Sequence, residues 1–427
     1  MKRRGLMKRF FYPSHILKYV LVLLLLAPLP LISQVKAIKA RKIYSGTQGV
    51  IEKGVILIEH GKIVDIGEEA KIPWNAEVID YGQKVIIPGL VEAHAMRGYD
   101  KANEDNPLTP FVSVLDNYDT SHDAITEALR SGVTTINIMP GNATILGGRG
   151  AIFKTFGLVV EDALLVPDSG MKISVAGTPM QSRMGVMAQL RRYFNETKDY
   201  MEKKEKEQTA PKKDEMVSTP MSFRSPESVK YEAVADLLRG RYGAFFNCPS
   251  PSDVVQAQKF SEAYAFKAVY VLGPECYKSA DFIAEKKLKV ILDPELIYFE
   301  KGPVSEELKK VEVAKVFYDK DIEFALLSDP DKVHTRSLIY QAMKAVSCGV
   351  PADAALKFVT IVPAQILEVD RQVGSLEKGK LANFVVLDKE PLDLAAKVEF
   401  VYIEGKAVYD REKDEDLKEL TNEKIIQ

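Results

Sequence analysis

The feature that most constrains the fold is an alternation of strands and helices in the middle of the chain. Helical patterns over residues 252–265 and 279–286 lie between apolar segments typical of buried strands. These apolar segments cover residues 134–139, 171–176, 243–247, 268–272, 289–293 and 323–329. Strand, helix and strand at this spacing predict parallel βα units whose strands are covered on both faces.

Both ends of the chain have a different pattern, which is rich in strands alone. Turns that contain Gly61 and Gly405 each join two strands into a predicted hairpin. The predicted strands cover residues 40–44, 54–58, 62–66, 382–388, 397–404 and 406–409. The pattern by itself predicts an α/β fold with an added β structure.

Length and charge narrow the class of protein further. The 427 residues give room for two domains or for one large barrel with an attachment, and the apolar fraction of 46% is typical of a globular protein. The formal net charge of -2 predicts no nucleic-acid partner.

Residues 1–37 are predicted to be a secretory signal peptide. The first 18 positions contain six lysine and arginine residues and no acid, and an apolar run follows up to Ser33. The run is shorter than the ~20 residues of a membrane-spanning helix, and Pro28 and Pro30 would disturb one, so an uncleaved anchor is the alternative. Cleavage after Ala37 would give an exported protein, periplasmic or extracellular.

A motif at residues 85–98 carries a family resemblance. It reads Val-Ile-Ile-Pro-Gly-Leu-Val-Glu-Ala-His-Ala-Met-Arg-Gly, an apolar strand interrupted at Pro88-Gly89. It resembles the first barrel strand of the amidohydrolase superfamily, where a His-X-His pair binds metal. Residues 355–367 are similar to the family's Thr-X-X-Pro-Ala-X-X-Leu helix. Residues 373–388 are similar to its Gly-Ser-Leu-X-X-Gly-Lys-X-Ala-Asp strand entry, with Asn383 replacing the aspartate.

The resemblance, which is to the imidazolonepropionase-like branch, implies a TIM-like (β/α)8 barrel inserted into a composite β-sandwich. Residues 38–86 and 371–410 would form the sandwich, and residues 87–370 the barrel. A charged loop is predicted near residues 200–226, and residues 411–427 are predicted to be a polar tail.

The resemblance also implies where a metal site would lie. The family holds its metal at the carboxyl ends of the barrel strands. His94 and Asp329 match two of its ligands, and in active relatives the aspartate also takes the proton of the attacking water, the catalytic role predicted for Asp329. Met96, Asn247 and Leu272 stand where the family has histidines. A thioether, a neutral amide and a hydrocarbon are poor replacements for imidazole, so the sequence predicts a degenerate metal site.

The metal-bridging position is left open between Lys154 and Lys172. A lysine that is solvated or paired at a strand edge is the simpler interpretation of each. His60 at a hairpin turn and His122 at a helix start are predicted to be surface residues. His334 is a further candidate at the barrel mouth.

The three cysteines are too few and too widely spaced for a disulfide scaffold. Separate burial is predicted for Cys248, Cys276 and Cys348. A disulfide between Cys248 and Cys276, or a metal site that uses both thiolates, is the alternative.

Several basic side chains are candidate ligand contacts. Arg97, Arg149 and Arg183 could bind an anionic group, because guanidinium recognises carboxylates in two-point fashion, and Lys154 is a further candidate. The alternative for each arginine is a surface or helix-capping role.

Together these observations favour an exported protein derived from metal-dependent hydrolases of carbon–nitrogen bonds in non-peptide or cyclic amides. Its catalysis is expected to be impaired or lost, with no cofactor or a weakly bound divalent metal, zinc if any. It would bind a small molecule, and the resemblance implies a homo-oligomer or a hetero-oligomer with a catalytic relative. The alternative is an active amidohydrolase that cleaves an amide or ester with an unusual ligand set including His94 and Asp329.

Overall fold

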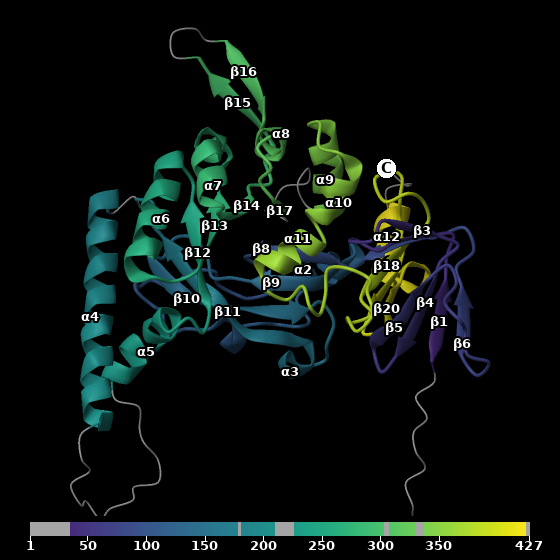
Figure 1. The fold of residues 1–427 in the computed structure, drawn as a ribbon, viewed down its shortest axis with the longest axis horizontal. Helices are drawn as coiled ribbons and strands as arrows, with labels where there is room; N and C mark the ends of the chain where they lie inside the picture. Colours follow the sequence, from purple (N-terminus) through teal and green to yellow (C-terminus); the bar gives the residue numbers. More distant parts are fainter. Residues whose placement is uncertain (1–34, 178–180, 210–225, 303–306, 330–336, 424–427) are drawn as a thin grey trace, which may run out of the picture. The chain divides into compact units, whose positions relative to one another are not determined.

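The two strand-rich ends of the chain fold together into one β-sandwich (Figure 1). The structure, a computed structural model, describes residues 35–177, 181–209, 226–302, 307–329 and 337–423. One sheet, in the order β5-β4-β1-β6, consists of β1 (Lys36–Lys39), β4 (Val55–Glu59), β5 (Lys62–Gly67) and β6 (Glu77–Asp80). The other, in the order β20-β19-β18-β7-β2-β3, consists of β2 (Lys42–Tyr44), β3 (Val50–Glu52), β7 (Val85–Pro88), β18 (Phe384–Leu387), β19 (Val398–Ile403) and β20 (Lys406–Asp410).

The pairing of β7 with β18 joins the two ends of the chain. The two strands run antiparallel, and Ile86 lies opposite Val386. Both side chains are fully buried and pack with Ile38, Ile56 and Phe384 between the sheets. Because residues on alternate positions of each strand share this core, the amino and carboxyl segments depend on each other for their buried face.

The middle of the chain forms a nearly closed eight-stranded sheet in the order β17-β14-β13-β12-β11-β10-β9-β8. Its strands are β8 (Leu90–Ala95), β9 (Val133–Ile138), β10 (Leu146–Lys154), β11 (Leu164–Ser174), β12 (Gly243–Cys248), β13 (Ala268–Leu272), β14 (Lys289–Leu292) and β17 (Phe324–Leu326). Backbone hydrogen bonds to Phe358 and Val359 bridge the gap between β8 and β17. Val91 N donates to Val359 O at 2.9 Å, and Leu326 N donates to Phe358 O at 3.0 Å. The predicted barrel inserted into a composite sandwich is confirmed.

One strand departs from the pattern of parallel βα units. β10 runs antiparallel to both β9 and β11, and only the short helix α3 (Val160–Ala163) lies between β10 and β11. Antiparallel neighbours need no long crossover. Glycine is required at position 148 of β10, because a Cβ added there would lie 2.6 Å from Val112 O.

Helices cover the outside of the barrel. The predicted helices over residues 252–265 and 279–286 correspond to α6 and α7. α6 begins with a capping box, in which the Ser250 N–H donates to Asp253 Oδ2 at 3.0 Å. The helices are α2 (Asp123–Arg130), α4 (Arg183–Thr209), α5 (Pro226–Leu238), α6 (Pro251–Tyr264), α7 (Ala280–Lys286), α8 (Val313–Tyr318), α9 (Leu338–Ser347), α10 (Ala352–Lys357), α11 (Ile361–Ile366) and α12 (Glu415–Glu423), with 3-10 turns η1 (Val114–Asp116), η2 (Pro274–Ser279) and η4 (Arg411–Lys413).

The Pro88-Gly89 break is the crossing point from sandwich to barrel. β7 of the sandwich ends at Pro88, and β8 of the barrel begins two residues later at Leu90. A Cβ added at Gly89 would overlap the Thr134 side chain and lie 2.8 Å from its Cβ. Glycine is therefore required here by the close approach of β9, not by its backbone freedom.

Three predicted boundaries differ from the structure. The helix α4 continues to Thr209, so residues 200–209 of the predicted charged loop are helical. The predicted polar tail contains α12. Asp414, the residue before this helix, forms an ion pair with Arg130 Nε at 2.6 Å. Ala37 lies within β1 and is fully buried, so cleavage after it would remove half of that strand.

A hairpin that the sequence pattern did not predict projects beyond the barrel (Figure 1). It consists of β15 (Ile297–Lys301) and β16 (Leu308–Glu312). Tyr298 Oη donates to Glu275 at 2.6 Å and Tyr277 Oη donates to Glu300 at 2.8 Å, which fixes the hairpin to η2.

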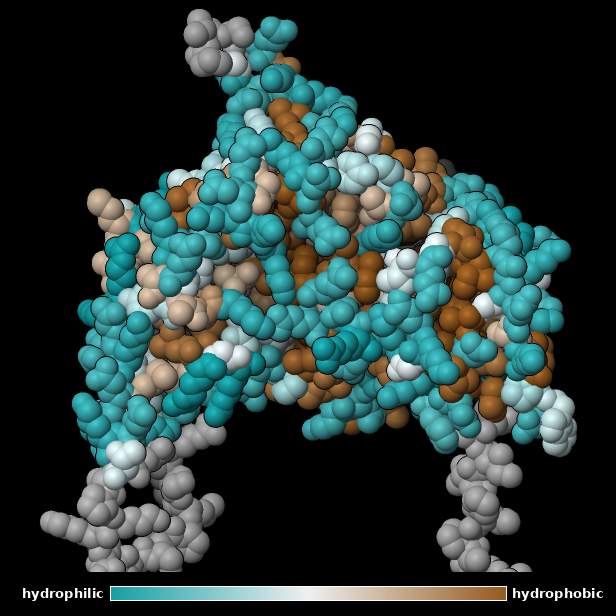
Figure 2. Space-filling model, viewed as in Figure 1, coloured by the Kyte–Doolittle hydropathy of each residue, from teal (hydrophilic) through white to brown (hydrophobic). Residues whose placement is uncertain are grey.

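Figure 2 shows a mostly hydrophilic face, with hydrophobic residues over the barrel strands and the sandwich. Among the described residues, no helix is both long and apolar enough to cross a membrane.

Candidate active site at the barrel mouth

A cavity of about 480 Å³ opens at the carboxyl ends of the barrel strands. All five positions that the family resemblance singled out line it: His94 and Met96 at the end of β8, Asn247 on β12, Leu272 on β13 and Asp329 after β17. Parallel strands bring their carboxyl ends to one edge, which explains why residues so far apart in sequence meet here. The structure thus assembles the predicted positions, while their roles in metal binding and catalysis stay predictions.

His94 contacts a lysine inside the barrel. Its Nε2 lies 3.1 Å from Lys172 Nζ, and both side chains are buried. Burial, with a smaller contribution from Lys172, lowers the pKa of His94 well below its usual value. Burial also lowers the pKa of Lys172 to about 7. Both groups are therefore uncharged above neutral pH, and one can donate a hydrogen bond to the other.

The two lysines left open by the sequence lie in different places, while the metal-bridging role stays a prediction. Lys172 lies at the barrel centre beside His94, so its interpretation as a solvated or edge-paired lysine is wrong. Lys154 Nζ pairs with Glu404 at 2.8 Å, away from the mouth cavity. Lys154 therefore does not line that cavity, and a ligand contact by this lysine stays a prediction.

The side chains at the mouth do not fit the metal site that the family implies. Met96 offers a thioether, Leu272 no donor at all, and Asn247 only a neutral amide oxygen. The Nε2 atom of His94 is engaged by Lys172. Within the described ranges of the chain, no group of three or more histidine, cysteine, aspartate and glutamate side chains is placed to hold a metal ion. A catalytic zinc typically needs three protein ligands.

A buried ion pair occupies part of the mouth. The Arg97 guanidinium contacts the Glu92 carboxylate, and the two side chains are 6% and 1% exposed. Ser328 Oγ donates to Glu92 and lies 3.4 Å from an Arg97 terminal nitrogen. Arg97 is a predicted ligand contact, and it does line the cavity. Glu92 and Ser328 are not among the predicted residues, although Glu92 precedes His94 by two residues on the same face of β8.

Arg183 and Arg149 do not line the mouth. Arg183 Nε pairs with Asp253 at 2.8 Å and is half exposed, and Arg149 pairs with Asp168 at 2.8 Å. Arg183 contacts Ser250 and Asp253 at the start of α6, and its role as a ligand contact stays a prediction.

The cysteines are buried free thiols, which confirms separate burial and contradicts a disulfide. Cys276 Sγ donates to Cys248 O at 3.1 Å, and neither side chain lines the mouth cavity. Burial raises the pKa of Cys276 to about 12, so its thiol stays protonated. A metal site built on two thiolates therefore has no support.

His122 and His60 do not line the mouth cavity. His122 caps α2, where its Nδ1 accepts from Ala124 N at 3.1 Å. His60 is an exposed residue of the hairpin turn before β5, with φ of 50°. His334 lies outside the described residues.

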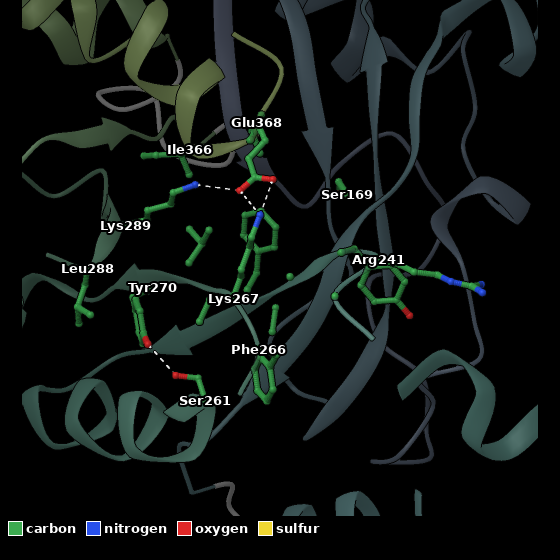
Figure 3. A pocket seen from close by; sticks show the side chains of 18 of the residues that line it. Ser169, Arg241, Ser261, Phe266, Lys267, Tyr270, Leu288, Lys289, Ile366 and Glu368 are labelled. Atoms are coloured by element: carbon green, nitrogen blue, oxygen red, sulfur yellow. Dashed lines mark hydrogen bonds and ion pairs between the residues drawn. The ribbon is translucent and has the colours of Figure 1, made fainter. Parts of the chain in front are cut away.

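A larger cavity, of about 650 Å³, lies at the opposite end of the barrel. Figure 3 shows Lys267 and Lys289 around the Glu368 carboxylate, at the amino ends of β13 and β14. Their nitrogens lie 3.0 and 3.2 Å from Glu368 Oε1. Since barrel enzymes carry their chemistry at the carboxyl ends of the strands, this floor cavity is not the candidate active site.

Comparison with known proteins agrees with this architecture. Residues 257–412 match the amidohydrolase family. The crystal structure of an amidohydrolase from Thermotoga maritima MSB8 superposes with a TM-score of 0.77 and is 30% identical, covering 88% of this chain and all of that one.

Two curated relatives are more distant. A 5-methylthioadenosine/S-adenosylhomocysteine deaminase of Bacillus cereus (strain 03BB102) is 23% identical and covers 79% of this chain and 81% of the relative. Amidohydrolase tasK of Hapsidospora irregularis is 24% identical over 84% of this chain, which spans only 40% of that relative's length. The 30% identity to the Thermotoga structure over 88% of this chain shows that the chain belongs to the amidohydrolase family.

Proposed function

We propose that this chain is an exported member of the family whose metal-dependent hydrolysis of carbon–nitrogen bonds is impaired or lost. Its barrel mouth would instead bind a small ligand, or the chain would serve as the partner of a catalytic relative. The single observation that carries the proposal is the presence of Met96, Asn247 and Leu272 on the wall of one cavity, where imidazoles would be needed.

The neighbouring groups support the same proposal. Family catalysis requires a metal that acidifies a bound water, and the Asp329 carboxylate would accept that proton. His94 is turned toward Lys172 instead of an open coordination position. The charged pair of Arg97 and Glu92 fills space beside it. These contacts make the cavity better suited to holding a small ligand than to holding a catalytic metal ion.

The second candidate function is an active amidohydrolase with an unusual ligand set. It is favoured by one observation: Glu92, His94, Asp293 and Asp329 all line the mouth cavity, and carboxylate oxygens do bind divalent metals. The substrate class would then be a non-peptide or cyclic amide, or an ester.

Elemental analysis of the purified full chain distinguishes the two candidates. The proposal expects zinc, iron and manganese well below one equivalent, and no change in metal content in the Asp329→Ala variant. Near-stoichiometric metal that is lost in Asp329→Ala would establish the active alternative. The Asp168→Ala variant is the matched control, because this acid pairs with Arg149 outside the mouth cavity.

Export is the second part of the proposal. It is supported by the basic and apolar pattern of the first 33 residues. Because β1 needs Lys36 and Ala37, we expect the mature chain to begin at or before Val35. Cell fractionation followed by amino-terminal sequencing tests this; a cytoplasmic chain that retains Met1 would contradict it, and one that retains Met1 in the membrane fraction would identify an anchor.

A further inference from the structure

We propose that the β-sandwich contacts the surface of a lipid membrane through Trp74, the single tryptophan of the sequence. The inference rests on the export proposed above, because it names the surface that the amino end of an exported chain meets. It concerns the sandwich and is independent of what the barrel mouth binds.

The starting observation is the exposure of Trp74, which is 97% exposed. Tryptophan is highly buried on average in soluble proteins, so a fully exposed indole leaves an unusually large apolar ring in water. The backbone around it is held in place, because Ala76 N donates to Pro73 O at 3.0 Å and closes a turn with Trp74 and Asn75 in its middle. The turn therefore places the ring outside the fold.

The loop that contains Trp74 is fixed to the sandwich by its other apolar residues. They pack on the face of the sheet β5-β4-β1-β6 that lies opposite the sandwich core. This small cluster consists of Ala37, Val55 and Leu57 of the sheet and Ala70, Ile72 and Ala76 of the loop. Val78 of β6 lies opposite Ala37 on the same face and is 51% exposed. Trp74 and Val78 are thus the parts of this apolar surface that water still reaches.

The strand topology puts this turn beside the point where the amino-terminal segment enters the fold. β1 and β6 run parallel, with Lys36 opposite Glu77, so their amino ends lie at the same end of the sheet (Figure 1). Glu77 N also donates to Val35 O at 2.9 Å. In the sequence, two residues separate Lys36 from the basic and apolar run of residues 1–33. Two residues span at most about 7 Å, so a membrane that takes up this run during export lies at the same end of the sandwich as Trp74.

The chemistry of the turn fits a bilayer surface. Indole combines an apolar ring with one N–H donor, and tryptophan is enriched at membrane–water interfaces for that reason. In residues 68–77 the exposed carboxylates of Glu68, Glu69 and Glu77 outnumber the exposed ammonium group of Lys71. Anionic lipid therefore adds no attraction at this site, and the ring makes the contact. Neutral phosphatidylcholine is the appropriate probe.

Intrinsic fluorescence tests the contact directly. Because the sequence has one tryptophan, the emission of the unlabelled full chain reports on position 74 alone. The full chain is mixed with phosphatidylcholine vesicles, with and without bromine atoms on the acyl chains near the headgroups. We expect the emission to shift to shorter wavelength on vesicles and to lose intensity on the brominated lipid. The matched control combines Trp74→Phe with Phe299→Trp, which moves the tryptophan to a position 56% exposed in the β15–β16 hairpin and should show neither change.

Three results would overturn the inference. The chain could sediment with the vesicles while the emission of Trp74 stays unchanged, which would mean that residues 1–33 alone hold it there. It could fail to bind the vesicles at all. The emission could also shift without vesicles as the protein concentration rises, which would identify a second copy of the chain as the occupant. Export is judged separately, because a cytoplasmic location in the cell fractionation refutes export whatever the vesicles show.

Discussion

The ion pair between Glu92 and Arg97 allows a quantitative test of the mouth's architecture. The two side chains are 1% and 6% exposed, so removing one partner leaves a buried charge without compensation. Such a loss typically costs about 3–5 kcal/mol, whereas replacing both partners of a buried pair by neutral groups is often close to neutral. We therefore expect Glu92→Gln and Arg97→Met each to be strongly destabilising, and the double variant to be more stable than either.

Urea unfolding followed by far-UV circular dichroism measures these differences. Tryptophan fluorescence is a poor reporter, because the single tryptophan, Trp74, is 97% exposed. The surface pair of Arg192 and Glu196, 72% and 40% exposed, is the matched control and should contribute at most about 0.5 kcal/mol. Additive costs in the Glu92 and Arg97 cycle would refute the reasoning, since they would mean that the two charges do not compensate each other.

Further predictions concern pH and packing. The pKa of Lys172 is about 7 in the folded chain and 10.5 in the reference state. At pH values between these two, Lys172 carries a proton in the unfolded chain but not in the folded chain. Stability should therefore rise with pH across that window by up to about 1.4 kcal/mol per pH unit, and Lys172→Met should remove the slope in pH-dependent urea unfolding. The lowered pKa of His94 adds a loss of stability as pH falls below its reference value of 6.5, which His94→Gln should reduce. Gly89→Ala should cost about 1–3 kcal/mol or more by overlap with Thr134, whereas Gly67→Ala, with open space around it, should change thermal stability little; equal effects would contradict the packing argument.

The sequence predicted the strands that carry the mouth positions because their signals are local. β12, β13 and β17 are short apolar runs, and the family motif indicates which residue follows or ends each strand. A parallel arrangement then brings Asn247, Leu272 and Asp329 to one cavity without further information.

Other features depend on contacts that no local pattern encodes. The direction of β10 is one, because apolar runs do not distinguish a parallel strand from an antiparallel one. The contact of His94 with Lys172 joins residues 78 positions apart. The β15–β16 hairpin carries exposed side chains such as Phe299 on one face, which obscured its alternation. Burial of Arg97 against Glu92 likewise follows from the packed mouth, although the two residues are near neighbours in sequence.

The most direct measurement is zinc binding before and after the missing imidazoles are restored. Isothermal titration would compare the wild-type chain with a variant that combines Met96→His, Asn247→His and Leu272→His. We expect no stoichiometric zinc binding by wild type and one tightly bound zinc in the triple variant, because the restored side chains share a cavity with His94 and Asp329. One equivalent of zinc bound as tightly by wild type as by the triple variant would contradict the loss of the metal site.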